Sequence, residues 1–149
     1  MAVDDPYDLE RFVRAQDADG IYGRALAELR AEHKTGHWMW FVFPQIAGLG
    51  QSETSRGYAV ASLAEAGAYL RHPLLGPRLI ECAHIVEGSR TLSATQTFGA
   101  VDAKKLHSCM TLFMRAAPEE PLFARVLERY FAGVPDRNTD RLLRSQDGT

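Results

Sequence analysis

A lysine and a serine lie one helical turn apart in a stretch whose spacing predicts an amphipathic helix over residues 102–116. On a helical wheel the predicted core arc is formed by Leu106, Cys109, Met110 and Phe113. Lys105 and Ser108 fall on a second stripe, which also contains the apolar Leu112, so we expect this stripe to be partly covered. An ammonium group and a hydroxyl presented together suit an anionic or polar ligand. The structural alternative is a surface ion pair between Asp102 and Lys105, with the Ser108 hydroxyl bonded to its own helix backbone.

An aromatic run over residues 37–45 is the second candidate locus. Two tryptophans separated by one residue could stack a planar ligand, although such a run is more often simply core. The Gln45 side chain and the amides of residues 48–50 could bind a phosphate or carboxylate beside Ser52 at a helix N-terminus. His37 could equally cap the carbonyl groups of a preceding helix.

The predicted site therefore lies between residues 37–45 and the helix that begins at Asp102. Its candidate ligand-binding residues are His37, Trp38, Trp40, Gln45, Ser52, Lys105 and Ser108. The sequence implies no cofactor, and its five histidines show no metal-ligand spacing. It also contains no GxSxG, Walker, GxGxxG or HExxH motif, so catalytic residues are not identified and an enzymatic role stays open.

Composition is that of an ordinary globular protein: 149 residues, 46% hydrophobic and 24% charged, with a net charge of −2. The sequence has no basic stripe of the kind that follows a phosphate backbone, so nucleic-acid binding is disfavoured. Its nearest approach to a basic cluster is three arginines in the tail, Arg137, Arg141 and Arg144. The longest apolar run is far shorter than the ~20 residues of a membrane span, and the first residues do not resemble a signal peptide. We expect a cytoplasmic protein in which Cys82 and Cys109 are buried thiols. The sequence does not specify the oligomeric state.

Capping residues, prolines and glycines predict an all-α fold, a compact irregular arrangement of seven to eight short-to-medium helices rather than an up-down bundle. Predicted helices start near Asp5-Pro6 and cover about residues 21–34, 52–60, 62–71, 74–86, 93–99, 102–116 and 122–132. Residues 37–45 are expected to form a buried short helix or irregular turn. We expect one domain over residues 1–149, with an ordered core over about 5–139 and a frayed tail over 140–149.

Several segments resemble a known family, the domain of unknown function 1810 of small bacterial proteins. The matching residues are 9–16, 37–45, 48–50, Ser52, Tyr58, 69–76, Asp102, Lys105, Leu106, Ser108 and 110–113. The resemblance runs from about Tyr7 to Thr139 and implies a mostly helical single domain without implying a function. In the family pattern, serine is typical at the position of Cys109, and arginine or another polar residue is typical at the position of His107. The resemblance therefore weakens the case for Cys109 as a nucleophile and for His107 as a base.

Two functions are compatible with these features. The first is a domain that binds a small molecule, nucleotide-like or otherwise anionic, with catalysis left open. The alternative is a non-catalytic interaction module or scaffold, in which the aromatic run is only core and another surface docks a partner.

Overall fold

The computed structural model describes residues 4–146, and nearly all of its regular structure is helical. The helices are α1 (Glu10–Asp17), α2 (Ile21–Arg30), α3 (Met39–Val42), α4 (Glu53–Gly57), α5 (Leu63–Arg71), α6 (Leu75–Glu87), α7 (Ala94–Ala116), α8 (Pro121–Phe131) and α9 (Arg137–Gln146). A 3₁₀ turn over Ala18–Gly20 joins α1 to α2. A single parallel bridge between Ile46 and Val60 is the β-structure found in the described part of the chain. The predicted all-α fold is confirmed.

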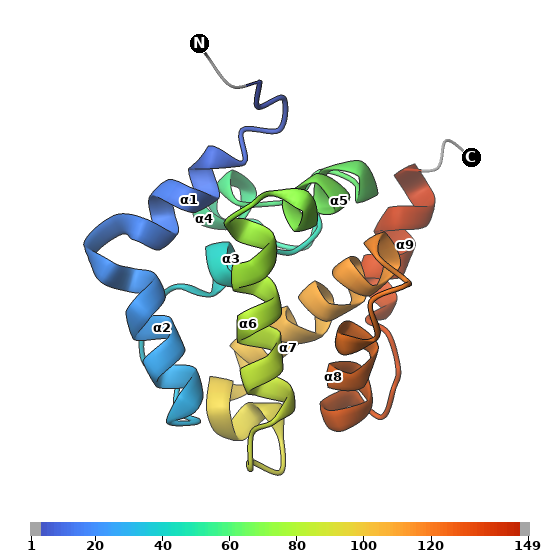
Figure 1. Cartoon of the computed structure of the whole chain (residues 1–149). Coiled ribbons are helices and arrows are strands. Elements are labelled where there is room, and N and C mark those ends of the chain that lie inside the picture. The colour runs from blue at the N-terminus through green and yellow to red at the C-terminus, as the bar shows by residue number, and fades with distance from the viewer. Residues whose placement is uncertain (1–3, 147–149) are drawn as a thin grey trace.

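Two long helices organise the molecule. Helix α7 packs against α5, α8 and α9, and α6 packs against α2, α5 and α8. Figure 1 shows α6 at the centre of the view with α7 crossing behind it, α1 and α2 on one side, and α8 and α9 on the other. Because the helices cross in different directions, the arrangement is an irregular cluster and not an up-down bundle.

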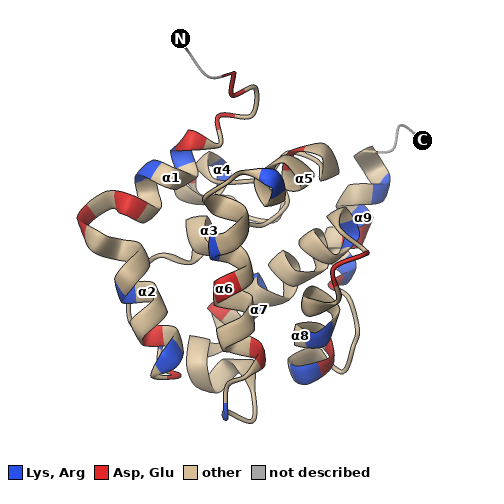
Figure 2. Ribbon diagram, viewed as in Figure 1, with Lys and Arg blue, Asp and Glu red and all other residues tan. Residues whose placement is uncertain are grey.

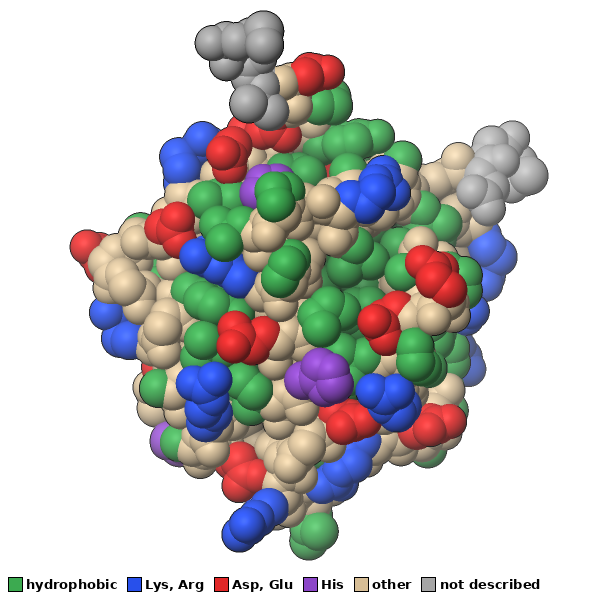
Figure 3. All heavy atoms as spheres, viewed as in Figure 1, with side chains coloured by type: hydrophobic (Ala, Val, Ile, Leu, Met, Phe, Trp, Pro, Cys, Tyr) green, Lys and Arg blue, Asp and Glu red, His purple; other side chains and the backbone are tan. Residues whose placement is uncertain are grey.

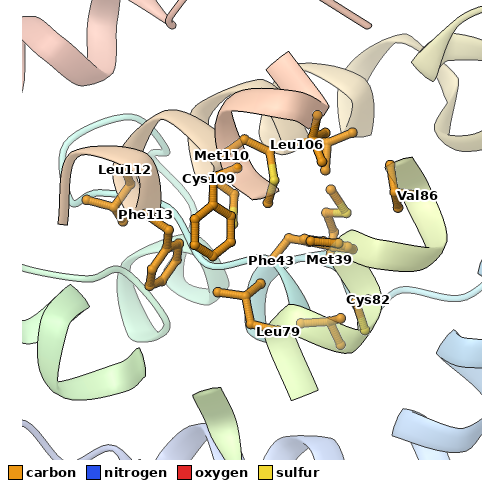
Figure 4. Close-up of a cluster of buried hydrophobic side chains, with 14 of the residues drawn as sticks. Met39, Phe43, Leu79, Cys82, Val86, Leu106, Cys109, Met110, Leu112 and Phe113 are labelled. Carbon is orange, nitrogen blue, oxygen red and sulfur yellow. The ribbon is translucent and has the colours of Figure 1, made fainter. Parts of the chain in front are cut away.

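The core fills the space between α3, α6 and α7. Side chains from these helices, including Met39, Leu79 and Met110, point toward one another in Figure 4. All four residues of the predicted core arc of α7 are fully buried: Leu106, Cys109, Met110 and Phe113. Burial of each large apolar side chain stabilises the fold by about 1.5–3 kcal/mol. The aromatic run contributes Trp38, Phe41 and Phe43 to the same core, and it forms the short helix α3, as predicted.

Local capping explains where several helices begin. The hydroxyls of Ser52, Ser62 and Ser93 each accept a hydrogen bond from the amide three residues later, at 3.1, 3.1 and 3.3 Å. Gly99 has φ +80°, which interrupts α7 where the sequence predicts a boundary between two helices. The residues after Gly99 form the predicted helix that carries Asp102, Lys105 and Ser108.

Four predicted helix limits differ from the structure. Helix α4 ends at Gly57 instead of residue 60. Helix α2 ends at Arg30 instead of Lys34, because Glu32 turns the chain with φ +59°. Helix α1 begins only at Glu10, although the Asp5 carboxylate still accepts hydrogen bonds from the Leu9 and Glu10 amides at 2.8 and 3.0 Å. At the other end, residues 137–146 form α9, where fraying from residue 140 is predicted. Residues 147–149 of that predicted tail lie outside the described part.

Charged side chains are distributed over the surface. Lysines and arginines occur on most helices together with aspartates and glutamates (Figure 2), and the face in Figure 3 mixes both signs with apolar patches. Among the described residues, none of the helices has the length and apolar character needed to cross a membrane.

Candidate functional site

A cavity of about 320 Å³ lies between α7 and the segment formed by α3 and the residues after it. Four of the seven predicted site residues line it: Trp40, Gln45, Lys105 and Ser108. The first two come from α3 and the segment after it, and the other two from α7. Lys104 and Asp136 also face this cavity, and neither is identified from the sequence as a site residue.

Lys105 is held against Trp40 at the wall of this cavity. Its ammonium nitrogen lies 3.8 Å from the centre of the Trp40 ring and 3.1 Å from an oxygen of Asp102. The side chain is 17% exposed, so the cation is largely shielded from water. The negative face of an indole attracts a cation at this distance. Lys105 thus has a fixed position and still borders the open space.

Asp102 binds a second lysine, Lys34, at 2.7 Å. The Lys34 side chain is 6% exposed, and its ammonium nitrogen lies 4.9 Å from the Trp38 ring centre. One carboxylate therefore lies between two lysine–tryptophan pairs. Burial alone would raise the pKa of Asp102, but the hydrogen bonds from Lys34 and Lys105 outweigh it and hold this pKa below its ordinary value.

Trp38 is part of the core and not of the cavity wall. It is 2% exposed, and its indole nitrogen donates a 3.0 Å hydrogen bond to Glu28. The same carboxylate oxygen accepts hydrogen bonds from the amides of Thr35 and Gly36 at 2.8 and 2.9 Å. A Cβ atom on Gly36 would lie 2.8 Å from the Trp38 ring, so the close packing here requires glycine. The sequence predicts that Gly36 ends α2. In the structure Gly36 allows this close contact instead, and α2 ends earlier, at Arg30.

The Ser108 hydroxyl is already engaged in internal hydrogen bonds. It is 3.1 Å from the Lys104 carbonyl oxygen and 3.2 Å from an oxygen of Asp136. That Asp136 oxygen also accepts hydrogen bonds from the amide and hydroxyl of Thr139, at 3.0 and 2.6 Å, in the first turn of α9. With one proton to donate, Ser108 shares it between the own-helix bond of the structural alternative and the contact with Asp136, which connects α7 to the start of α9.

His37 and Ser52 are not brought to this cavity. Both are exposed, and neither is among the residues that line it. Ser52 caps α4 instead, where its hydroxyl accepts the Ser55 amide. Since α4 has only five residues, it offers no substantial N-terminal anion site.

A second cavity, of about 400 Å³, lies on another side of Trp40. It shares Trp40, Gln45, Gly50 and Ser55 with the first cavity. Its remaining wall includes Arg56 and Tyr58, and neither is among the site residues predicted from the sequence.

His107 also lines the first cavity, but its ring is held in place. Its Nε2 atom lies 2.7 Å from the Val134 carbonyl oxygen, and the ring stacks on Phe131 at 4.1 Å between centres. Within residues 4–146, no group of three or more His, Cys, Asp or Glu side chains is arranged to hold a metal ion.

Comparison with known proteins gives the family. The sequence matches the family described as "Protein of unknown function (DUF1810)" over residues 6–143. This chain belongs to the DUF1810 family. The similarity predicted from the sequence motifs is thus confirmed, and the family carries no known function.

A solved structure shows the same fold. It is the crystal structure of the conserved hypothetical protein Rv1873 from Mycobacterium tuberculosis, which is 49% identical to this DUF1810 protein, with a TM-score of 0.90. The match covers 94% of this chain and 99% of that chain. A search of curated proteins found no match.

Proposed function

We propose that this DUF1810 protein binds an anionic, nucleotide-like small molecule in the cavity between Trp40 and α7. Lys104 and Lys105 face the anionic group, and the partly exposed Trp40 contacts a planar part of the ligand. The observation that carries the proposal is the position of Lys105. Its ammonium group is shielded from bulk water, fixed by Trp40 and Asp102, and placed at the cavity wall.

The local charge favours an anion, although the whole chain has a net charge of −2. Lys104 and Lys105 line the cavity, and the acidic residue among its lining residues is Asp136. Asp136 already accepts hydrogen bonds from Ser108 and Thr139, and Asp102 divides its charge between two lysines. Charges in a partly buried site are less screened than surface charges, so the excess of lysine supports binding of an anion.

Hydrogen-bonding capacity and size support the same proposal. The Gln45 side-chain amide lines the cavity and has no hydrogen-bond partner within residues 4–146, so it is available to a ligand. A volume of about 320 Å³ is at the small end of the range for small-molecule pockets, which is roughly 300–1,000 Å³. The cavity therefore suits a compact metabolite better than a polymer.

An interaction module is the alternative function, and it has less support. Three large apolar side chains are more than half exposed in the described part: Leu92, Val101 and Val134. Single exposed apolar residues are common on monomers and do not define a docking surface.

A cytoplasmic location is part of the same proposal. Cys82 and Cys109 are both free and buried, which agrees with a protein that works in a reducing compartment.

A ligand screen with matched variants tests the function. Thermal unfolding is measured for the wild type, Lys105→Met and Arg30→Ala with nucleotides, phosphorylated sugars and carboxylates. Arg30 is the control, because it is an exposed cation on α2 with only a 3.9 Å ion pair to Glu81. A ligand at a hundredfold excess over its Kd should raise the melting temperature by roughly 5–10 °C.

We expect Lys105→Met to lose this shift and Arg30→Ala to keep it. The proposal is wrong if no compound stabilises the wild type, or if Lys105→Met responds as the wild type does.

A further inference from the structure

The two cavities around Trp40 are two chambers of one depression. We call them the Lys105 chamber, which faces α7, and the Arg56 chamber, which faces α4. Trp40, Gln45, Gly50 and Ser55 border both chambers. A ligand that lies over these shared residues therefore has access to both.

Two of the four residues that border both chambers, Gly50 and Ser55, are small and lie in close contact. A Cβ atom on Gly50 would lie 2.3 Å from the Ser55 hydroxyl oxygen, so a glycine is needed here. Ser55 is held by Ser52, whose hydroxyl and carbonyl oxygens lie 3.1 and 3.0 Å from the Ser55 hydroxyl. Ser52 thus acts on the depression indirectly, by positioning one of its borders.

Each chamber is bordered by a cationic side chain that forms no ion pair within the described residues. The side chains of Arg56 and Lys104 have no ion-pair or hydrogen-bond partner within residues 4–146. The Gln45 amide, which lies between the chambers, is equally uncommitted. One cation in each of two adjoining chambers forms a pattern that complements two anionic groups on one molecule.

We infer that the ligand carries two separated anionic groups and spans both chambers. One group faces Lys104 and Lys105, and the other faces Arg56. The uncharged segment between them, which carries the planar group in a nucleotide-like ligand, lies over Trp40 and Gln45. This inference rests on the proposed function and narrows the ligand to small molecules with two anionic groups, of which a nucleoside bisphosphate is the nucleotide-like case.

Linkage of the two groups strengthens binding. Once the first anionic group occupies one chamber, the second binds at a high effective concentration, so a linked dianion gains affinity that a monoanion lacks. Because the side chains of Lys104 and Arg56 are both exposed, this gain in affinity should decrease as the salt concentration increases.

The test compares matched probes by isothermal titration calorimetry. Adenosine 5′-monophosphate is compared with adenosine 3′,5′-bisphosphate, and ribose 5-phosphate with ribulose 1,5-bisphosphate. The proteins are the wild type, Arg56→Gln, Lys105→Met and the control Arg71→Gln. Arg71 is an exposed arginine of α5 that also has no side-chain partner among the described residues.

We expect at least one bisphosphate to bind the wild type about tenfold more tightly than its monophosphate, a difference of about 1.4 kcal/mol. Arg56→Gln should remove this preference and leave the monophosphate affinity unchanged, whereas Arg71→Gln should keep it. The inference is overturned if the preference is absent or survives in Arg56→Gln. Monophosphate binding that depends on Lys105 but not on Arg56 would leave the proposed function standing, and no binding by any probe would count against both.

Discussion

The ammonium groups of Lys34 and Lys105 bind the two different oxygens of one carboxylate, that of Asp102, at 2.7 and 3.1 Å. Lys34 follows α2 and Lys105 belongs to α7, so Asp102 connects segments that are distant in the sequence. Since each ammonium group also lies over a tryptophan ring, this arrangement fixes the aromatic segment that leads to the cavity.

Replacement of Asp102 by asparagine should destabilise the protein. The substitution removes the negative charge and leaves two largely buried ammonium groups without a counterion. We expect a loss of about 2 kcal/mol in the free energy of unfolding, measured by urea denaturation at pH 7. Asp17→Asn is the control: its ion pair with Arg78 has a similar length, 2.9 Å, but Asp17 is 52% exposed, so we expect a loss below about 1 kcal/mol. Equal losses in the two variants would show that burial does not increase the contribution of the Asp102 ion pairs to stability.

The contribution of Asp102 should also depend on pH. Its pKa is lower in the folded protein than in the unfolded chain, so its stabilisation is complete above the ordinary carboxyl pKa and is lost as pH falls through the folded value. The stability difference between the wild type and Asp102→Asn should therefore be constant from about pH 5 to 8 and decrease below about pH 4. Urea titrations across this range measure the difference. A difference that grows on acidification would contradict the assignment.

Two glycines in helices should respond in opposite ways to alanine. In α6, a Cβ atom on Gly76 would lie 2.1 Å from the Leu70 carbonyl oxygen, where backbone cannot move aside easily, so Gly76→Ala should destabilise by about 3 kcal/mol. In α2, no atom lies within 4 Å of a Cβ on Gly23, so Gly23→Ala should stabilise by about 0.5–1 kcal/mol. Chemical denaturation of both variants measures the two signs. A tolerated Gly76→Ala would show that α5 and α6 do not approach as closely as described.

Both cysteines should be inert in the native protein. Cys82 and Cys109 are fully buried, and burial raises the pKa of Cys82 to about 12 and that of Cys109 well above its ordinary value. Because the thiolate is the reactive form, we expect a disulfide reagent such as 5,5′-dithiobis(2-nitrobenzoate) to label neither residue at pH 8. Both should react after addition of denaturant, which serves as the positive control. Rapid labelling of the native protein would contradict their burial.

Local chemistry explains what the sequence predicts correctly. Ser93 and Gly99 mark their helix boundaries through a side-chain cap and a positive φ angle, and both effects act within a few residues. The sequence also predicts correctly that the stripe beside the core arc of α7 is partly buried, because the apolar Leu112 lies on the same stripe as Lys105 and Ser108. These predictions need only local capping chemistry and helical periodicity.

The features that the sequence does not predict depend on tertiary contacts between segments that are distant in the chain. The amide of Lys34 donates to the Thr97 carbonyl oxygen at 2.8 Å, and its side chain meets Asp102, so the predicted extension of α2 is replaced by contacts with α7. Arg56 reaches the depression only because α4 folds back toward Trp40. The sequence does not predict helix α9 because the helix is mostly polar, and its buried residues, Thr139 and Leu143, supply little apolar surface.

The bridge between Ile46 and Val60 has an evolutionary consequence. Two backbone hydrogen bonds of 2.8 Å, from the Ala47 amide to Val60 and from the Val60 amide to Gln45, fasten both ends of the intervening loop. This loop contains the short helix α4. Since doubling the length of a flexible loop costs only about 0.6 kcal/mol, the connections beside α4 can change in length without disturbing the longer helices outside the loop. Descendants of one ancestral DUF1810 protein can therefore change the wall of the Arg56 chamber through substitutions in this loop, while α7 keeps the lysines of the Lys105 chamber.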